Sequence, residues 1–313
     1  MGRIIPNDLP FYAALLDSIS AARDLPLLRR THGRLVHLSL SPRPFLRSKL
    51  LAAYARCSRL HESRLLLSLF LSSSLRLPPL FSLNALLSSL PPLPSLLLLR
   101  RMLYLGVKPN SLSFSAALRS AAAIPSLRLV RLLHALSIVS SLHHPPSLIA
   151  AYSKSGDFPS ARKVFDEMPE RARSFEARTA MISALGAHGM AEEAVGMFDE
   201  MGPEVDDKAV TAALAACAHA GMLVEARRVF RSVSGRRRTV EHYTCMVDVL
   251  GRAGRVEEAE ALLTEMEAEE MDEGIWAALL AACRLHGRID VAERIADRLY
   301  GLKAELNNCT SAS

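Results

Sequence analysis

Glycines recur at almost even spacing through the second half of this 313-residue chain, at Gly156, Gly189, Gly221, Gly254 and Gly287. The intervals between them are 33, 32, 33 and 33 residues. An alanine follows each glycine after five residues, and an apolar residue follows each alanine after four more, as Ala161 and Phe165 do in the first cycle. This spacing predicts a helix, a glycine-terminated turn and a second helix in every cycle.

A repeat of this size cannot bury its own apolar face, so neighbouring repeats must stack. The chain is therefore predicted to be all-α, a right-handed α-solenoid of about eight stacked helix-turn-helix repeats. The aromatic content of 5% and the apolar content of 50% suit closely packed helices better than a twisted sheet. An ordinary helical bundle is the alternative, but a bundle requires no regular series of glycines.

Apolar spacing and turn residues divide the chain into five parts. These are a short amino-terminal segment (1–10), divergent repeats (11–144), regular repeats (145–240), a final repeat with an extension (241–302) and a polar tail expected to be disordered (303–313). First helices are expected to begin near Ser48, Asn84 and Ala180, and a second helix over 61–70. Prolines between residues 91 and 94 should cut one helix short.

The charge balance favours a polyanionic partner, since the formal net charge is +6 and the isoelectric point about 9.2. Positive charge concentrates at the amino end. The first sixty residues hold only Asp8, Asp17 and Asp24 against Arg3, Arg23, Arg29, Arg30, Arg34, Arg43, Arg47, Lys49, Arg56 and Arg59. A solvated basic surface without any ligand is the alternative interpretation of the same pattern.

No residue pattern indicates an enzyme, a metal site or a cofactor. The five cysteines never approach the two-residue spacing of a metal clip, so reduced structural thiols are expected. The sequence contains no paired nucleophile and base and no phosphate-binding glycine loop. Arginines and prolines interrupt the leucine-rich stretch 65–105, which leaves no apolar run of about twenty residues, so no membrane partner is predicted.

Three longer strings carry a family resemblance. Residues Ser147–Arg171 resemble the short repeat of plant pentatricopeptide repeat proteins, and Met102–Asn110 looks like the end of that family's standard repeat. Residues Glu241–Glu260, with Ile275–Gly287 after them, look like the penultimate repeat and E-type extension of organellar RNA-editing members. On these strings the chain is identified as a member of the PLS subfamily with a truncated E-type carboxyl terminus.

The resemblance implies single-stranded RNA as the partner, with each repeat presenting one side chain of its first helix and its final residue to one base. The family pattern places the first-helix position at Ser48, Asn84, Ser115, Thr179, Thr211 and Thr244, and the final position at Asn110, Asp206 and Asp272. By the family's code the Asn84–Asn110 pair favours a pyrimidine and the Thr179–Asp206 pair guanine, with Thr244–Asp272 similar. Helix capping is the alternative role for these short polar residues.

Two repeats depart from this pattern, because Ala13 and Pro146 occupy the equivalent first-helix position and neither side chain can form a hydrogen bond with a base.

The implied function is recognition of sites for C-to-U RNA editing in an organelle, the mitochondrion being preferred to the chloroplast. The His-x-Glu and Pro-Cys-x-x-Cys strings of a zinc deaminase are missing from this sequence, so a DYW-type deaminase or an editing accessory protein would be a partner acting in trans. RNA splicing, stabilisation or processing is the first alternative. A protein-binding scaffold of tetratricopeptide type is the second, although its Trp-Leu-Gly-Tyr pattern does not recur.

Overall fold

The computed structural model describes residues 9–41, 43–57, 59, 61–63, 65–66, 68, 79–142, 144–202, 205–233, 238–266 and 271–297. Within these ranges all regular secondary structure is helical, which confirms the predicted all-α solenoid class. The chain forms two compact units, Met1–Gly156 and Asp157–Ser313. The predicted tail 303–313 lies outside the described residues, as do residues 64, 67, 69 and 70 of the predicted helix 61–70, whose other residues are helical.

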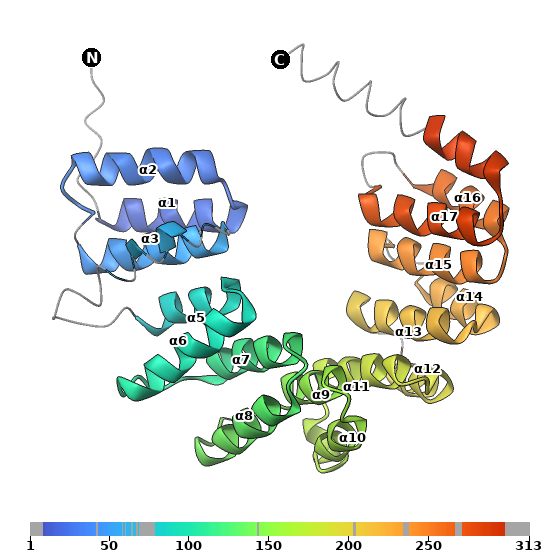
Figure 1. Cartoon of the computed structure of the whole chain (residues 1–313), viewed down its shortest axis with the longest axis horizontal. Coiled ribbons are helices and arrows are strands. Elements are labelled where there is room, and N and C mark those ends of the chain that lie inside the picture. The colour runs from blue at the N-terminus through green and yellow to red at the C-terminus, as the bar shows by residue number, and fades with distance from the viewer. Residues whose placement is uncertain are drawn as a thin grey trace. The chain divides into compact units, whose positions relative to one another are not determined.

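The first unit is built from helical hairpins in which successive first helices pack on one another (Figure 1). Its first helices are α1 (Leu9–Ala22), α3 (Pro44–Arg56), α5 (Leu80–Ser89), α7 (Ser111–Ala123) and α9 (Pro145–Lys154). Its labelled second helices are α2 (Leu25–His37), α6 (Pro92–Tyr104) and α8 (Leu127–Val139). Each of these second helices contacts its own first helix and the first helix of the next hairpin, so two helical layers result.

The second unit repeats the same arrangement with more regular spacing. Its first helices are α11 (Phe175–Ala187), α13 (Asp207–Ala220), α15 (Val240–Arg252) and α17 (Glu273–Leu285). The second helices are α10 (Phe158–Asp166), α12 (Ala191–Glu200), α14 (Leu223–Ser232) and α16 (Val256–Leu262), with short 3-10 turns at Glu170–Ala172 and Leu263–Glu265. The pairs α11 with α13, α13 with α15 and α15 with α17 form the main packing layer.

The glycine series has the predicted structural cause. All five glycines have a positive φ, between 65° and 80°, and each follows the carboxyl end of a first helix. Gly221, for example, is the left-handed C-cap of α13, and its N–H bonds the carbonyl of Cys217. The alanine five residues later is fully buried in four of the cycles, at Ala161, Ala194, Ala226 and Ala259. The helical-repeat prediction is therefore confirmed.

First helices begin earlier than predicted. They start at Pro44, Leu80 and Phe175, about one turn before the residues at which apolar periodicity becomes visible. A proline or a capping residue marks each of these starts, at Pro44, Pro79 and Ser174. At α11 the Ser174 side chain accepts a hydrogen bond from the N–H of Ala177 and thereby satisfies a free helix donor. The proline interruption is confirmed, because α5 ends at Ser89 and α6 begins at Pro92.

Ion pairs connect successive second helices of the second unit. Arg162 of α10 bonds Glu193 of α12 at 2.5 Å, Arg228 of α14 bonds Asp199 of α12 at 2.7 Å, and Arg227 of α14 bonds a carboxylate of α16. The pairs are solvent-exposed, so each contributes only about 0.2–1 kcal/mol. Their spacing of nearly one repeat keeps neighbouring hairpins in register.

Candidate nucleic-acid interface

The predicted first-helix positions share one place in their helices. They are Ser48 in α3, Asn84 in α5, Ser115 in α7, Thr179 in α11, Thr211 in α13 and Thr244 in α15. In each helix the residues two and three positions later are buried and apolar, as Leu86 and Leu87 are in α5. The common register places the candidates of each unit on the same face of consecutive first helices.

The hydroxyl groups at these positions differ in their hydrogen bonds. Ser48 is fully buried and its Oγ donates to the Phe45 carbonyl at 2.7 Å, so this predicted site residue does not reach the surface. Thr211 and Thr244 donate to the carbonyls four residues earlier, at 2.9 and 2.8 Å. Ser115 and Thr179 are half-buried, and their hydroxyls have no hydrogen-bond partner among the described residues. Both oxygen atoms are themselves buried, so a ligand can reach these unbonded hydroxyls only after a local movement of the side chains around them.

All three predicted junction residues are helix caps. Asn110 caps α7, Asp206 caps α13 and Asp272 caps α17, each through its Oδ1 atom. The distances to the acceptor oxygen from the backbone N–H groups are 3.1, 2.9 and 3.0 Å. Helix capping, the alternative role given above for these short polar residues, is therefore sufficient to explain their presence at these positions. It uses one oxygen and leaves the rest of each side chain available to a second partner.

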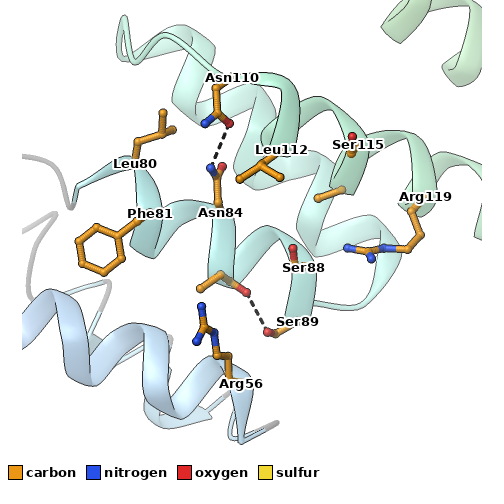
Figure 2. A pocket seen from close by; sticks show the side chains of 12 residues that line it. Arg56, Leu80, Phe81, Asn84, Ser88, Ser89, Asn110, Leu112, Ser115 and Arg119 are labelled. Atoms are coloured by element: carbon orange, nitrogen blue, oxygen red, sulfur yellow. Dashed lines mark hydrogen bonds between the residues drawn. The ribbon is translucent and has the colours of Figure 1, made fainter. Parts of the chain in front are cut away.

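The structure brings Asn84 and Asn110 together. Asn84 Nδ2 donates to Asn110 Oδ1 at 3.0 Å (Figure 2). Ser113 Oγ donates to Asn84 Oδ1 at 2.6 Å. Asn84 is buried to 9% exposure, whereas Asn110 is half-buried. The bonds fix the orientation of both amides. They leave the Asn110 Nδ2 hydrogens and one Asn84 N–H without a partner among the described residues, so the pair presents donors to whatever lies beside it.

An open groove of about 470 Å³ surrounds this pair. It lies between α5 and α7, with one residue from α3, and is lined by Arg56, Leu80, Phe81, Asn84, Ala85, Ser88, Ser89, Asn110, Leu112, Ser115, Ala116 and Arg119. Phe81 and Leu112 are exposed at 44% and 63%. The guanidinium groups of Arg56 and Arg119 enter from different helices (Figure 2). Apolar faces, amide donors and positive charge thus meet in one concave surface.

Sequence reasoning missed four of these groove residues as candidates: Phe81, Leu112, Arg56 and Arg119. Helical spacing from the predicted positions would have found the two arginines. Arg119 follows the predicted site residue Ser115 by four residues, which is about one helical turn. Arg56 follows the predicted site residue Ser48 by eight residues, which is about two turns. Phe81 and Leu112 each stand two residues after a helix cap, Pro79 and Asn110.

A second groove of about 460 Å³ lies in the second unit, between α15 and α17. Its lining includes Asp248, Arg252 and Arg284, but none of the predicted site residues. Arg252 Nε bonds both carboxylate oxygens of Asp248 at 3.1 Å, which neutralises part of its charge. This groove therefore offers less uncommitted positive charge than the groove at Asn84.

The two units carry opposite charge. The first unit holds 19 of the 38 Lys and Arg residues but only 4 of the 32 Asp and Glu residues, and the second holds the other 19 and 28. No acidic residue occurs between Glu62 and Asp157. The described residues contain no group of three His, Cys, Asp or Glu side chains that could hold a metal ion. In the same part of the chain, no helix is long and apolar enough to cross a membrane.

Comparison with known proteins identifies the repeat. The PPR repeat family model matches residues 147–172, 177–202 and 234–267. A pentatricopeptide repeat-containing protein of Arabidopsis thaliana is 31% identical over 306 residues, which cover 93% of this chain and 31% of that protein. A mitochondrial relative from Arabidopsis thaliana is 36% identical, and the match covers 66% of this chain and 38% of that protein. The chloroplastic relative CRR2, also from Arabidopsis thaliana, is 32% identical, and the match covers 62% of this chain and 31% of that protein.

The chain spans only 24–41% of the length of the first three curated relatives it matches. Among solved structures, it is similar to the maize pentatricopeptide repeat protein PPR10 in complex with an 18-nt psaJ RNA element. The TM-score is 0.59 at 16% identity, over 96% of this chain and 51% of that chain. At this identity the likeness shows the fold alone.

Proposed function

Because the chain belongs to the pentatricopeptide repeat family, we propose that it binds single-stranded RNA of organellar transcripts without acting as an enzyme. The family supplies the premise, and PPR10 is a member solved with RNA. The observation that carries the proposal is the groove between α5 and α7, where the Asn84–Asn110 pair lies beside exposed apolar side chains and two arginines.

Each part of the groove suits one part of a nucleotide. The Phe81 ring and the Leu112 side chain are exposed apolar surfaces against which a base can stack. The free amide donors of Asn110 and Asn84 can bond the carbonyl oxygens of a base edge, in line with the pyrimidine preference implied by the family code. Arg56 and Arg119 supply cations for the phosphates on either side of that base.

The remaining site residues belong to the same proposal. Ser115 and Thr179 have unbonded but buried hydroxyl oxygens, which would contribute after a local side-chain movement, and Asp206 is exposed at the cap that follows Thr179's repeat. Thr211, Thr244 and Asp272 would contribute after giving up or sharing the local bonds described above. Ser48 is excluded from direct contact in this conformation because it is fully buried.

The finer proposal is that the bound RNA is a site of C-to-U editing, with a DYW-type deaminase supplied in trans. The E-like segment after residue 241 supports this function over splicing, stabilisation or processing. The related proteins named mitochondrial and chloroplastic support an organellar site of action, and we retain the mitochondrion as the first choice. Comparing the transcripts crosslinked to the chain with the sites that lose editing in a loss-of-function line separates editing from the alternatives.

Binding itself is tested with a panel of RNA oligomers and the full chain. Phe81→Ala should weaken binding between about fivefold and a hundredfold, because stacking on an aromatic ring contributes about 1–3 kcal/mol per base. Phe175→Ala is the matched control, since Phe175 is equally exposed (48%) in the first turn of α11 and lies outside the groove. Equal affinities of the two variants would refute the assignment of the groove.

The contribution of Arg119 to RNA binding is measured from the salt dependence of the affinity. Arg119→Gln should lower the slope of log affinity against log salt by about 0.7, the value for one phosphate contact to a single strand. An unchanged slope would remove Arg119 from the phosphate path. Thr179→Asn then tests base readout: a changed base preference at one register supports it, and an unchanged preference with unchanged affinity contradicts it.

A further inference from the structure

Two second helices of the first unit expose apolar stripes that the RNA groove does not use. On α6 the exposed residues Leu93, Leu97 and Tyr104 recur at intervals of four and seven, so they share one helix face. On α8 Leu132 and Val139 stand seven residues apart in the same way. The groove lining comes only from α3, α5, α7 and the cap of α7, so these stripes form a different surface.

The apolar residues at the helix ends protrude instead of lining a hollow. Tyr104, the last residue of α6, is 87% exposed, and Val139, the last residue of α8, is 84% exposed. Exposed apolar groups that gather on one region of a soluble protein mark an interaction surface, whereas single ones do not. Protruding tips fit a soft, deformable phase better than a rigid partner, which would need a matching pocket for each tip.

Positive charge accompanies both stripes. Arg100 and Arg101 lie on the exposed side of α6, and Arg128 and Arg131 on the exposed side of α8. All of α5 to α9 falls in the stretch 63–156, which contains no aspartate or glutamate. The surface is therefore complementary to a negatively charged partner. Because Tyr104 and Val139 are apolar and exposed, the partner should also have an apolar interior that can bury them.

We propose that the exposed faces of α6 and α8, which both pack on α7, dock on an anionic lipid surface, with Tyr104 and Val139 entering the headgroup region and Arg100, Arg101 and Arg128 contacting lipid phosphates. Long arginine side chains place their charge at the headgroups while their stems cover apolar surface. Such peripheral docking requires no spanning helix, so it agrees with the lack of one among the described helices. It leaves the RNA groove on α5 and α7 available.

The test is co-sedimentation of the full chain with vesicles of phosphatidylcholine alone and of phosphatidylcholine mixed with phosphatidylglycerol. The chain should partition onto the anionic vesicles and not onto the neutral ones. Replacing Arg100 and Arg101 by Gln should lower the partition coefficient roughly fivefold for each arginine. Tyr104→Ser or Val139→Ser should lower it roughly tenfold each, by the loss of apolar insertion.

Val224→Ser is the matched control, because Val224 is 76% exposed on α14 of the acidic second unit. It should leave partitioning unchanged. Absence of binding to anionic vesicles, or an equal loss in the Val224 control, overturns the proposal. Binding to an acidic amphipathic peptide without any binding to vesicles also overturns it in favour of a protein partner. The same variants are assayed for RNA affinity, which they should retain, so failure here is distinguishable from failure of the RNA proposal.

Discussion

A close approach between two successive first helices gives the sharpest stability prediction. Gly186 lies inside α11, and a Cβ added there would stand 2.6 Å from Ala216 Cβ and 2.9 Å from Ala216 Cα of α13. Ordinary contacts between carbon atoms are about 3.5–4.0 Å, so Gly186→Ala must push α11 and α13 apart by roughly 1 Å. Gly251 repeats the geometry one interface later, with its added Cβ 2.5 Å from Ala282 Cβ.

Two opposing terms set the magnitude. Replacing a helical glycine by alanine stabilises the helix by roughly 1 kcal/mol. Overpacking of a well-packed interface costs about 1–3 kcal/mol. Gly196 in α12 supplies the control, because a Cβ there meets nothing within 4 Å. Both variants gain the same helix propensity, so the difference between their unfolding free energies isolates the overpacking cost at roughly 1–3 kcal/mol.

Urea denaturation followed by circular dichroism measures this difference. Gly196→Ala should be as stable as the parent chain or slightly more so, and Gly186→Ala should unfold at lower urea with an unchanged slope. Adding Ala216→Gly to Gly186→Ala should relieve only part of the overpacking, since it removes the opposing methyl group but leaves the Cα 2.9 Å away and places a glycine inside α13, which costs roughly 1 kcal/mol. If Gly186→Ala matched Gly196→Ala, the two helices would not pack at the distance that the structure shows, and the reasoning would fail.

Three further predictions concern thiols, ion pairs and caps. Burial raises the pKa of the half-buried Cys245 thiol to about 11, so its alkylation by iodoacetamide should be slow near pH 8 and rise about tenfold per pH unit toward pH 11; a flat pH profile by mass spectrometry contradicts this. A double-mutant cycle on Arg228 and Asp199 should give an interaction free energy of about 0.2–1 kcal/mol in low salt and a smaller one in high salt. An interaction free energy that does not change with salt would contradict this prediction. Asp272→Ala should cost about 0.5–2 kcal/mol in urea unfolding by removing the α17 cap, whereas an unchanged midpoint would show that the cap is dispensable.

The fold was predictable from the sequence because its strongest signals are local. A left-handed turn favours glycine, a close helix contact requires a small residue, and both recur once per repeat, as at Gly221 and Ala226. Helix starts were less predictable. Helix α5 begins at Leu80, directly after Pro79, so the proline marks a boundary that was predicted one turn later, near Asn84.

The candidate groove was only half predictable. A family pattern identifies Asn84 and Asn110, but it cannot show that their amides bond one another, because that bond joins residues of two different helical hairpins. It also cannot show that Ser48, which occupies the equivalent position, turns inward to the Phe45 carbonyl. Exposure depends on how consecutive first helices stack, and this property is set by the whole interface and not by the repeat itself.

The register of the repeats explains why the two units should contribute unequally to RNA binding. Two residues after the helix cap, α3, α5 and α7 of the first unit have Phe45, Phe81 and Leu112, all exposed and apolar. The equivalent positions of the second unit hold Glu176, Lys208, Glu241 and Gly274. A glutamate offers a base no stacking surface and repels the adjacent phosphate. Threonines that match the family pattern in α11, α13 and α15 therefore face a poorer environment than Asn84 does, and crosslinks to bound RNA should concentrate on α3, α5 and α7.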